Sequence, residues 1–101
     1  MNLTPVCLVD AVGLTPRLVG EATPRLRELA AKHGPRPLEG VLPAVTCSAQ
    51  ASALTGALPS SHGIVGNGWL FRDTQEVRFW QQSRRLIQAQ TLYDVARERA
   101  A

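Results

Sequence analysis

Two continuous apolar runs in the first half of the chain have the pattern of buried strands. Residues 5–13 are rich in β-branched side chains and end in Asp-Ala-Val-Gly. This run predicts a strand of a parallel sheet, with Asp10 at its carboxyl end. The proline-rich segment 35–43 predicts a second strand around residues 38–42.

Helical spacing of apolar residues, together with start and stop signals, predicts three helices. Residues 23–34 begin with Thr-Pro and end in glycine, which are typical helix boundaries. A second helix is expected over about residues 47–55, where alanine and serine dominate before a closing glycine. A third is expected over residues 91–101, where Thr91 and Asp94 have the spacing of a capping box.

The remaining segments predict loops and one hairpin. Residues 14–22 predict a loop leading into a short helical turn, and residues 57–68 predict a long loop containing several Gly and Pro residues. The aromatic segments 69–72 and 76–80 predict short strands, and the three residues 73–75 between them predict a hairpin turn.

The order of these elements is strand, helix, strand, helix, hairpin, helix, which predicts an α/β fold with right-handed crossovers. A chain of 101 residues fits at most one small domain. Because the sequence stops inside a predicted helix, we expect residues 1–101 to be a single partial domain, the front of a larger one.

Composition and charge narrow the class of protein. Apolar residues make up 45% of the chain and charged residues 19%, which is typical of a globular protein. The net charge is +3, but the basic residues are scattered, whereas a nucleic-acid reader needs a basic stripe interleaved with aromatics. No apolar run approaches the ~20 residues that span a bilayer, and the N-terminus has no basic leader region. We therefore expect neither a nucleic-acid nor a membrane partner, although a small basic binding domain stays an alternative.

The two cysteines, Cys7 and Cys47, form neither a CxxC pair nor a disulfide framework. This usage favours a reducing compartment, and we expect a cytoplasmic location.

Thr46 lies at the junction between an extended apolar stretch and the second predicted helix. One interpretation makes it the helix N-cap, which stabilises a helix by about 1 kcal/mol. The other makes it a nucleophile, since free N–H groups and the positive end of the helix dipole favour a phosphate there. A threonine hydroxyl still needs a base or a metal for activation.

Two further residues carry a structural and a functional interpretation each. Asp10 is either a loop acid or a metal ligand at the carboxyl edge of a sheet, where α/β folds bind ligands. Asn67 precedes a glycine, so it is either a turn residue or a side-chain donor to a phosphate oxygen.

These residues belong to a pattern that resembles the N-terminal part of the alkaline phosphatase superfamily. Asp10 after an apolar run, "TPRLRELAAKHG" and "LPAVTCSAQASALTGALPSSHGIVGNGW" are most similar to the type I phosphodiesterase/nucleotide pyrophosphatase branch. Asn67 follows Thr46 by 21 positions, the spacing of that branch. The resemblance implies the N-terminal portion of an α/β/α sandwich with a mostly parallel sheet, plus a short β-hairpin.

The resemblance also implies a mechanism for hydrolysis of a phosphate ester or phosphodiester. Thr46 matches the nucleophile that becomes phosphorylated, and Asp10 and Thr46 match ligands of one of two zinc ions. Asn67 and the backbone N–H of Cys47 match the groups that hold a phosphate oxygen. His62 matches a loop position with a structural role.

The sequence departs from the family pattern in two ways. In nucleotide pyrophosphatases an aromatic residue, then proline and asparagine, usually follow the nucleophile, whereas Cys47, Ser48 and Ala49 follow Thr46 here. A sulfatase is excluded because the proline and arginine of its motif are absent after Cys47. The family's remaining metal ligands lie far downstream, so we expect this chain to be inactive alone and to hold no zinc stably. A non-catalytic fragment that acts through association, including self-association, stays an alternative.

Overall fold

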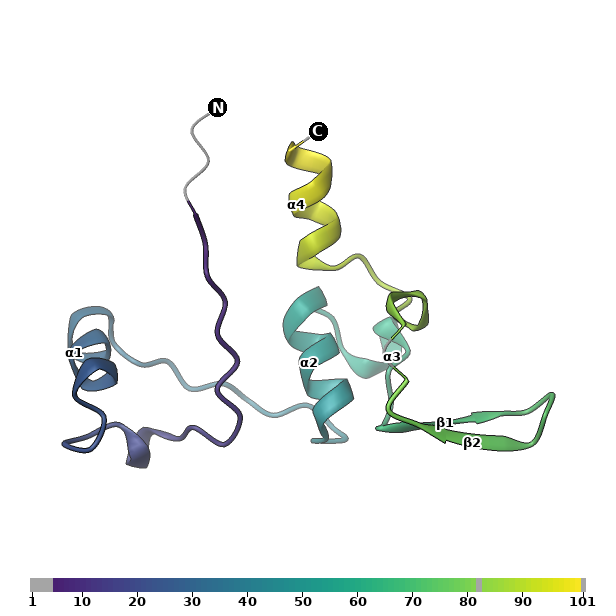
Figure 1. The fold of residues 1–101 in the computed structure, drawn as a ribbon, viewed down its shortest axis with the longest axis horizontal. Helices are drawn as coiled ribbons and strands as arrows, with labels where there is room; N and C mark the ends of the chain where they lie inside the picture. The colour runs from purple at the N-terminus through teal and green to yellow at the C-terminus, as the bar shows by residue number, and fades with distance from the viewer. Residues whose placement is uncertain (1–4, 82, 101) are drawn as a thin grey trace. The chain divides into compact units, whose positions relative to one another are not determined.

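The computed structural model describes residues 5–81 and 83–100, which fall into two units, Met1–Leu38 and Glu39–Ala101. The first unit contains the short 3-10 helix η1 (Pro16–Leu18) and the helix α1 (Pro24–His33). The second contains α2 (Thr46–Thr55), α3 (Pro59–His62), β1 (Gly68–Phe71), β2 (Glu76–Phe79), η2 (Arg84–Leu86) and α4 (Leu92–Ala100) (Figure 1).

All three predicted helices form, and most of their boundaries follow local sequence signals. α1 has Thr23 at its N-cap position, but the Thr23 hydroxyl donates to the Leu18 carbonyl at 2.8 Å instead of capping the helix. α2 ends at Thr55 and is followed by Gly56, whose left-handed φ of 66° suits glycine. The Thr91 capping box is confirmed by hydrogen bonds from Thr91 N–H to the Asp94 carboxylate and from Asp94 N–H to the Thr91 hydroxyl.

The predicted hairpin also forms. β1 and β2 pair antiparallel, with Trp69 opposite Arg78 and Leu70 opposite Val77, and the turn spans residues 72–75. In Figure 1 this hairpin extends beyond α2 and α3 of the same unit. The arrangement leaves β2 exposed at all four positions.

Three local predictions are wrong. Segments 5–13 and 38–42 form neither strand nor helix, and the side chains of Val6, Leu8 and Leu38 are exposed. A parallel strand depends on hydrogen bonds to neighbouring strands, and no described strand pairs with either segment. The loop predicted for 57–68 contains the one-turn helix α3. The structure is thus a small mixed α/β arrangement, and the parallel sheet and the sandwich stay predictions.

The second unit packs around α2, which contacts both α3 and α4. Ala51 of α2 and Ile64 after α3 are buried. His62 is fully buried between them, where its Nε2 lies 2.8 Å from the Ser52 hydroxyl and its Nδ1 accepts from Ile64 N–H at 3.1 Å. Both ring nitrogens therefore have partners, which agrees with the structural role expected for His62.

Candidate functional site

α2 begins at Thr46 because the preceding residues hold its first turn in place. Val45 occupies the N-cap position in an extended conformation, with φ −121° and ψ 162°. The buried Ser48 hydroxyl donates to the Pro43 carbonyl at 2.6 Å and lies 3.2 Å from the Val45 carbonyl. These contacts tie the loop before the helix to its first turn and so fix where Thr46 lies.

Thr46 is therefore the first residue of the helix and not its cap, so the N-cap interpretation is wrong. Its side chain is exposed. No hydrogen bond joins the Thr46 hydroxyl to any residue that the structure describes. The site thus presents an accessible hydroxyl at the positive end of a ten-residue helix.

Asn67 lies at the same helix end. Its Oδ1 accepts a hydrogen bond from the Cys47 N–H at 3.0 Å, and its backbone carbonyl accepts from the Trp80 N–H at 2.9 Å. Gly68 after it begins β1, while the hairpin turn lies at residues 72–75, so Asn67 is not a residue of that turn. Since Oδ1 faces the helix, the amide Nδ2 of Asn67 remains to donate to a ligand.

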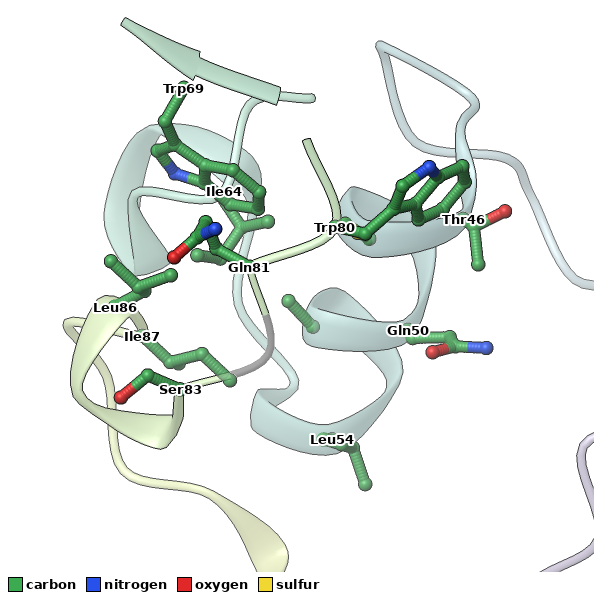
Figure 2. A pocket seen from close by; sticks show the side chains of 12 residues that line it. Thr46, Gln50, Leu54, Ile64, Trp69, Trp80, Gln81, Ser83, Leu86 and Ile87 are labelled. Carbon is green, nitrogen blue, oxygen red and sulfur yellow. The ribbon is translucent and has the colours of Figure 1, made fainter. Parts of the chain in front are cut away.

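A pocket of about 410 Å³ lies beside the start of α2. The residues that line it include Thr46, Gln50 and Leu54 of α2 and the tryptophans Trp69 and Trp80. Figure 2 shows the Trp80 indole and the Thr46 side chain at the same end of this helix. A volume of this size falls within the range of small-molecule sites.

Trp80 has an uncommon backbone for a bulky residue, with a φ of 56°. Such conformations cost free energy and persist where surrounding contacts fix them. Here the hydrogen bond from Trp80 N–H to Asn67 fixes the position of the tryptophan, so one asparagine holds both the helix end and the pocket wall.

The sequence matches the family model of type I phosphodiesterases/nucleotide pyrophosphatases over residues 6–99. The chain belongs to this family. Neither the curated proteins nor the solved structures gave a match. Family membership places Thr46, Cys47 and Asn67 in a chain of a hydrolase family that acts on phosphate esters.

The described residues offer few candidate metal ligands. Residues 5–81 and 83–100 contain no group of three His, Cys, Asp or Glu side chains that could hold a metal ion. Asp10 is exposed in the irregular segment of the first unit, whereas Thr46 belongs to the second unit. A metal shared by Asp10 and Thr46 therefore stays a prediction.

Asp94, which does not line the pocket, has a clearly lowered pKa. The guanidinium of Arg84 and then the N–H and hydroxyl of Thr91 hold the pKa of Asp94 well below its ordinary value. This carboxylate caps α4, and its interactions stabilise that helix.

Sequence reasoning missed Trp80, Trp69 and Ser48. Both tryptophans are far from Thr46 in sequence. Trp69 follows Asn67 on β1, and Trp80 reaches the pocket because the hairpin returns the chain to Asn67. Ser48 carried a weak signal, a serine in a first helical turn, which sequence alone does not distinguish from other serines.

Proposed function

We propose that this chain supplies the nucleophile and the phosphate-binding groups of a metal-dependent phosphoric ester hydrolase. The observation that carries the proposal is the exposed Thr46 hydroxyl, next to a helix N–H that Asn67 already holds. The family match over residues 6–99 supports the class of reaction.

In the proposed reaction the Thr46 oxygen attacks phosphorus, and the bond from phosphorus to the leaving oxygen breaks. The products of this step are a phospho-threonine and the released alcohol, and water then hydrolyses the phospho-threonine. The hydroxyl proton must leave before or during attack, because a neutral threonine hydroxyl is a weak nucleophile. No hydrogen bond of the described residues links Thr46 to a carboxylate or imidazole. In our proposal a metal ion therefore activates the hydroxyl.

The residues of this chain fit such a metal only in part. Zinc lowers the pKa of a hydroxyl that coordinates it, and a catalytic zinc takes three protein ligands. Asp10 and Thr46 would supply two oxygen ligands to one zinc. The described residues of this chain offer no candidate ligand for the second zinc. We therefore propose that this chain alone holds no catalytic zinc and does not turn over.

Two groups would stabilise the charge that develops on a phosphate oxygen. The oxygen would replace Asn67 Oδ1 as acceptor for the Cys47 N–H, while Asn67 Nδ2 donates to the same oxygen. The hydrogen bond from the Cys47 N–H to Asn67 Oδ1 at 3.0 Å supports this proposal because it brings the Asn67 side-chain amide close to the Cys47 N–H.

The pocket beside Thr46 offers space for the organic part of the ester. Its tryptophans are large apolar surfaces with one N–H donor each, which suits an alcohol or aryl group.

The chain also has two free thiols, Cys7 and Cys47, which supports a reducing, cytoplasmic location. In the described residues no helix combines the length and apolar character needed to cross a membrane.

The experiment uses the protein encoded by the complete open reading frame that contains this sequence, purified with zinc. Nitrophenyl phosphate and bis-nitrophenyl phosphate distinguish a monoesterase from a diesterase. Turnover that Thr46→Ala abolishes and Thr46→Ser retains in part would support the proposal. Turnover unchanged by Thr46→Ala would reject Thr46 as nucleophile, and no turnover of either ester would favour the non-catalytic alternative.

A further inference from the structure

The outer edge of β2 is open. Among the described residues the sheet has two strands, so each strand has one side without a neighbouring strand. β1 is half-buried at three of its four positions, whereas β2 is exposed at all four. β2 is therefore the edge that another strand can reach.

The backbone groups of β2 alternate between β1 and the open edge. The hydrogen bond from Trp80 N–H to the Asn67 carbonyl marks one bonded position of the antiparallel ladder. Bonded positions recur every second residue, so Arg78 and Glu76 also direct their backbone groups toward β1. The N–H and carbonyl of Val77 then face outward, ready to exchange two hydrogen bonds with a strand alongside.

The charges of β2 complement those of its own copy in one register. When a second β2 lies antiparallel with Val77 opposite Val77, Glu76 of each copy lies opposite Arg78 of the other. Shifting the register to the next bonded position places Arg78 opposite Arg78, which is unfavourable. In the favoured register the Glu76 and Arg78 positions are of the non-hydrogen-bonded type, where opposing side chains are closest.

We propose that two copies of this chain associate through β2, forming a four-stranded antiparallel sheet with a two-fold axis at Val77. Glu76 and Arg78 already form an ion pair within each copy, and Arg78 also lies 4.8 Å from the centre of the Phe71 ring. Both charged side chains are about half exposed, at 54% and 50%, and so are accessible to a second copy.

The face of the hairpin opposite to Glu76 and Arg78 would add apolar contacts to the proposed dimer. Leu70 lies opposite Val77 in the hairpin, and the two side chains are 56% and 60% exposed. In the paired sheet the two valines become neighbours, so an apolar row of Leu70, Val77 and their counterparts crosses four strands. Three or more strands with an apolar face are stable where an isolated hairpin is marginal.

The test compares charge variants by sedimentation velocity over a range of concentrations, using the 101-residue chain. Glu76→Arg and Arg78→Glu each place like charges opposite one another at both symmetric positions, so each should weaken self-association by about tenfold or more. An equimolar mixture of the two variants should form a heterodimer as tight as the wild-type dimer, because every opposed pair is then of opposite sign.

A proline variant tests the backbone hydrogen bonds of the proposed interface independently of its charges. Val77→Pro removes the outward N–H without removing a bond to β1, so the hairpin should persist while association is lost. Circular dichroism and tryptophan fluorescence check that each variant keeps its fold. A wild-type chain that stays monomeric at high concentration would overturn the proposal. Self-association that these variants leave unchanged, or that their mixture fails to restore, would overturn it as well.

Discussion

The Oδ1 atom of Asn67 accepts a hydrogen bond from the backbone N–H of Cys47 at 3.0 Å, across 20 positions of sequence. This contact joins the start of β1 to the first turn of α2 and leaves the Thr46 hydroxyl exposed beside it. Asn67 thus has a structural role in the ligand-free protein and, in our proposal, a second role with substrate.

Substitution at Asn67 should separate these two roles. Asn67→Ala removes the acceptor for the Cys47 N–H and should lower the free energy of unfolding by about 1 kcal/mol. Asn67→Asp keeps an acceptor there, so its stability should stay close to wild type. In the protein from the complete reading frame both variants lose the amide donor, and turnover should fall about a hundredfold. Full activity of Asn67→Asp would contradict the proposed role of Asn67 in binding the phosphate.

His62 should matter for stability and not for chemistry. His62→Ala leaves a buried cavity and removes the partners of the Ser52 hydroxyl and the Ile64 N–H. We expect the free energy of unfolding to fall by about 2–4 kcal/mol, measured by urea denaturation with tryptophan fluorescence. His33→Ala, at the exposed last position of α1, is the matched control and should change little. Equal effects of the two substitutions would contradict this assignment.

The Asp94 capping box should give the second unit a pH-dependent stability. Hydrogen bonds from Arg84 and then Thr91 lower the pKa of Asp94 below its ordinary value of 3.8. Because the folded-state pKa is lowered, the stabilisation is complete above the unfolded-state value and is lost as the pH falls below about 3.8.

Denaturation at several pH values below 6 tests this expectation. Asp94→Asn should lower stability at neutral pH and flatten the acid limb of the stability curve. Asp73→Asn, in the exposed hairpin turn, should leave that limb unchanged. An acid limb that is the same in Asp94→Asn and in the wild type would reject the role of this carboxylate.

Local signals in the sequence predicted the helices and the hairpin because each of these elements satisfies its backbone with nearby residues. The Thr91 and Asp94 box and the glycine after α2 act within one helical turn. The apolar run at 5–13 has the right composition for a strand, but a parallel strand depends on partners distant in sequence. Its failure to form in the structure reflects that dependence.

The candidate site also depends on contacts between residues distant in sequence, which local patterns do not predict. The position of Asn67 near Cys47 was expected from the family resemblance, because no local pattern links residues 20 positions apart. The position of Trp80 in the pocket was not expected, since it depends on a left-handed backbone at this residue, where a bulky side chain is rare.

The 101-residue chain should be catalytically silent by itself. It offers two candidate ligands for a metal that takes three, and a helix dipole supplies at most about 2 kcal/mol toward ionising the Thr46 hydroxyl. The assay adds zinc to the purified chain with nitrophenyl mono- and diesters and uses Thr46→Ala as the blank. Hydrolysis above that blank would mean that the chain already contains enough metal ligands.

The most direct test of the account is to find the phosphoryl group on Thr46. The zinc-loaded protein from the complete reading frame is mixed with excess bis-nitrophenyl phosphate, quenched in acid during turnover, digested and mapped by mass spectrometry. On this account Thr46 should carry a nitrophenyl phosphate group, formed with release of one nitrophenol; this group should be absent in Thr46→Ala and should decay when substrate is exhausted. Turnover with no label on Thr46, or with the label on another residue, would contradict it.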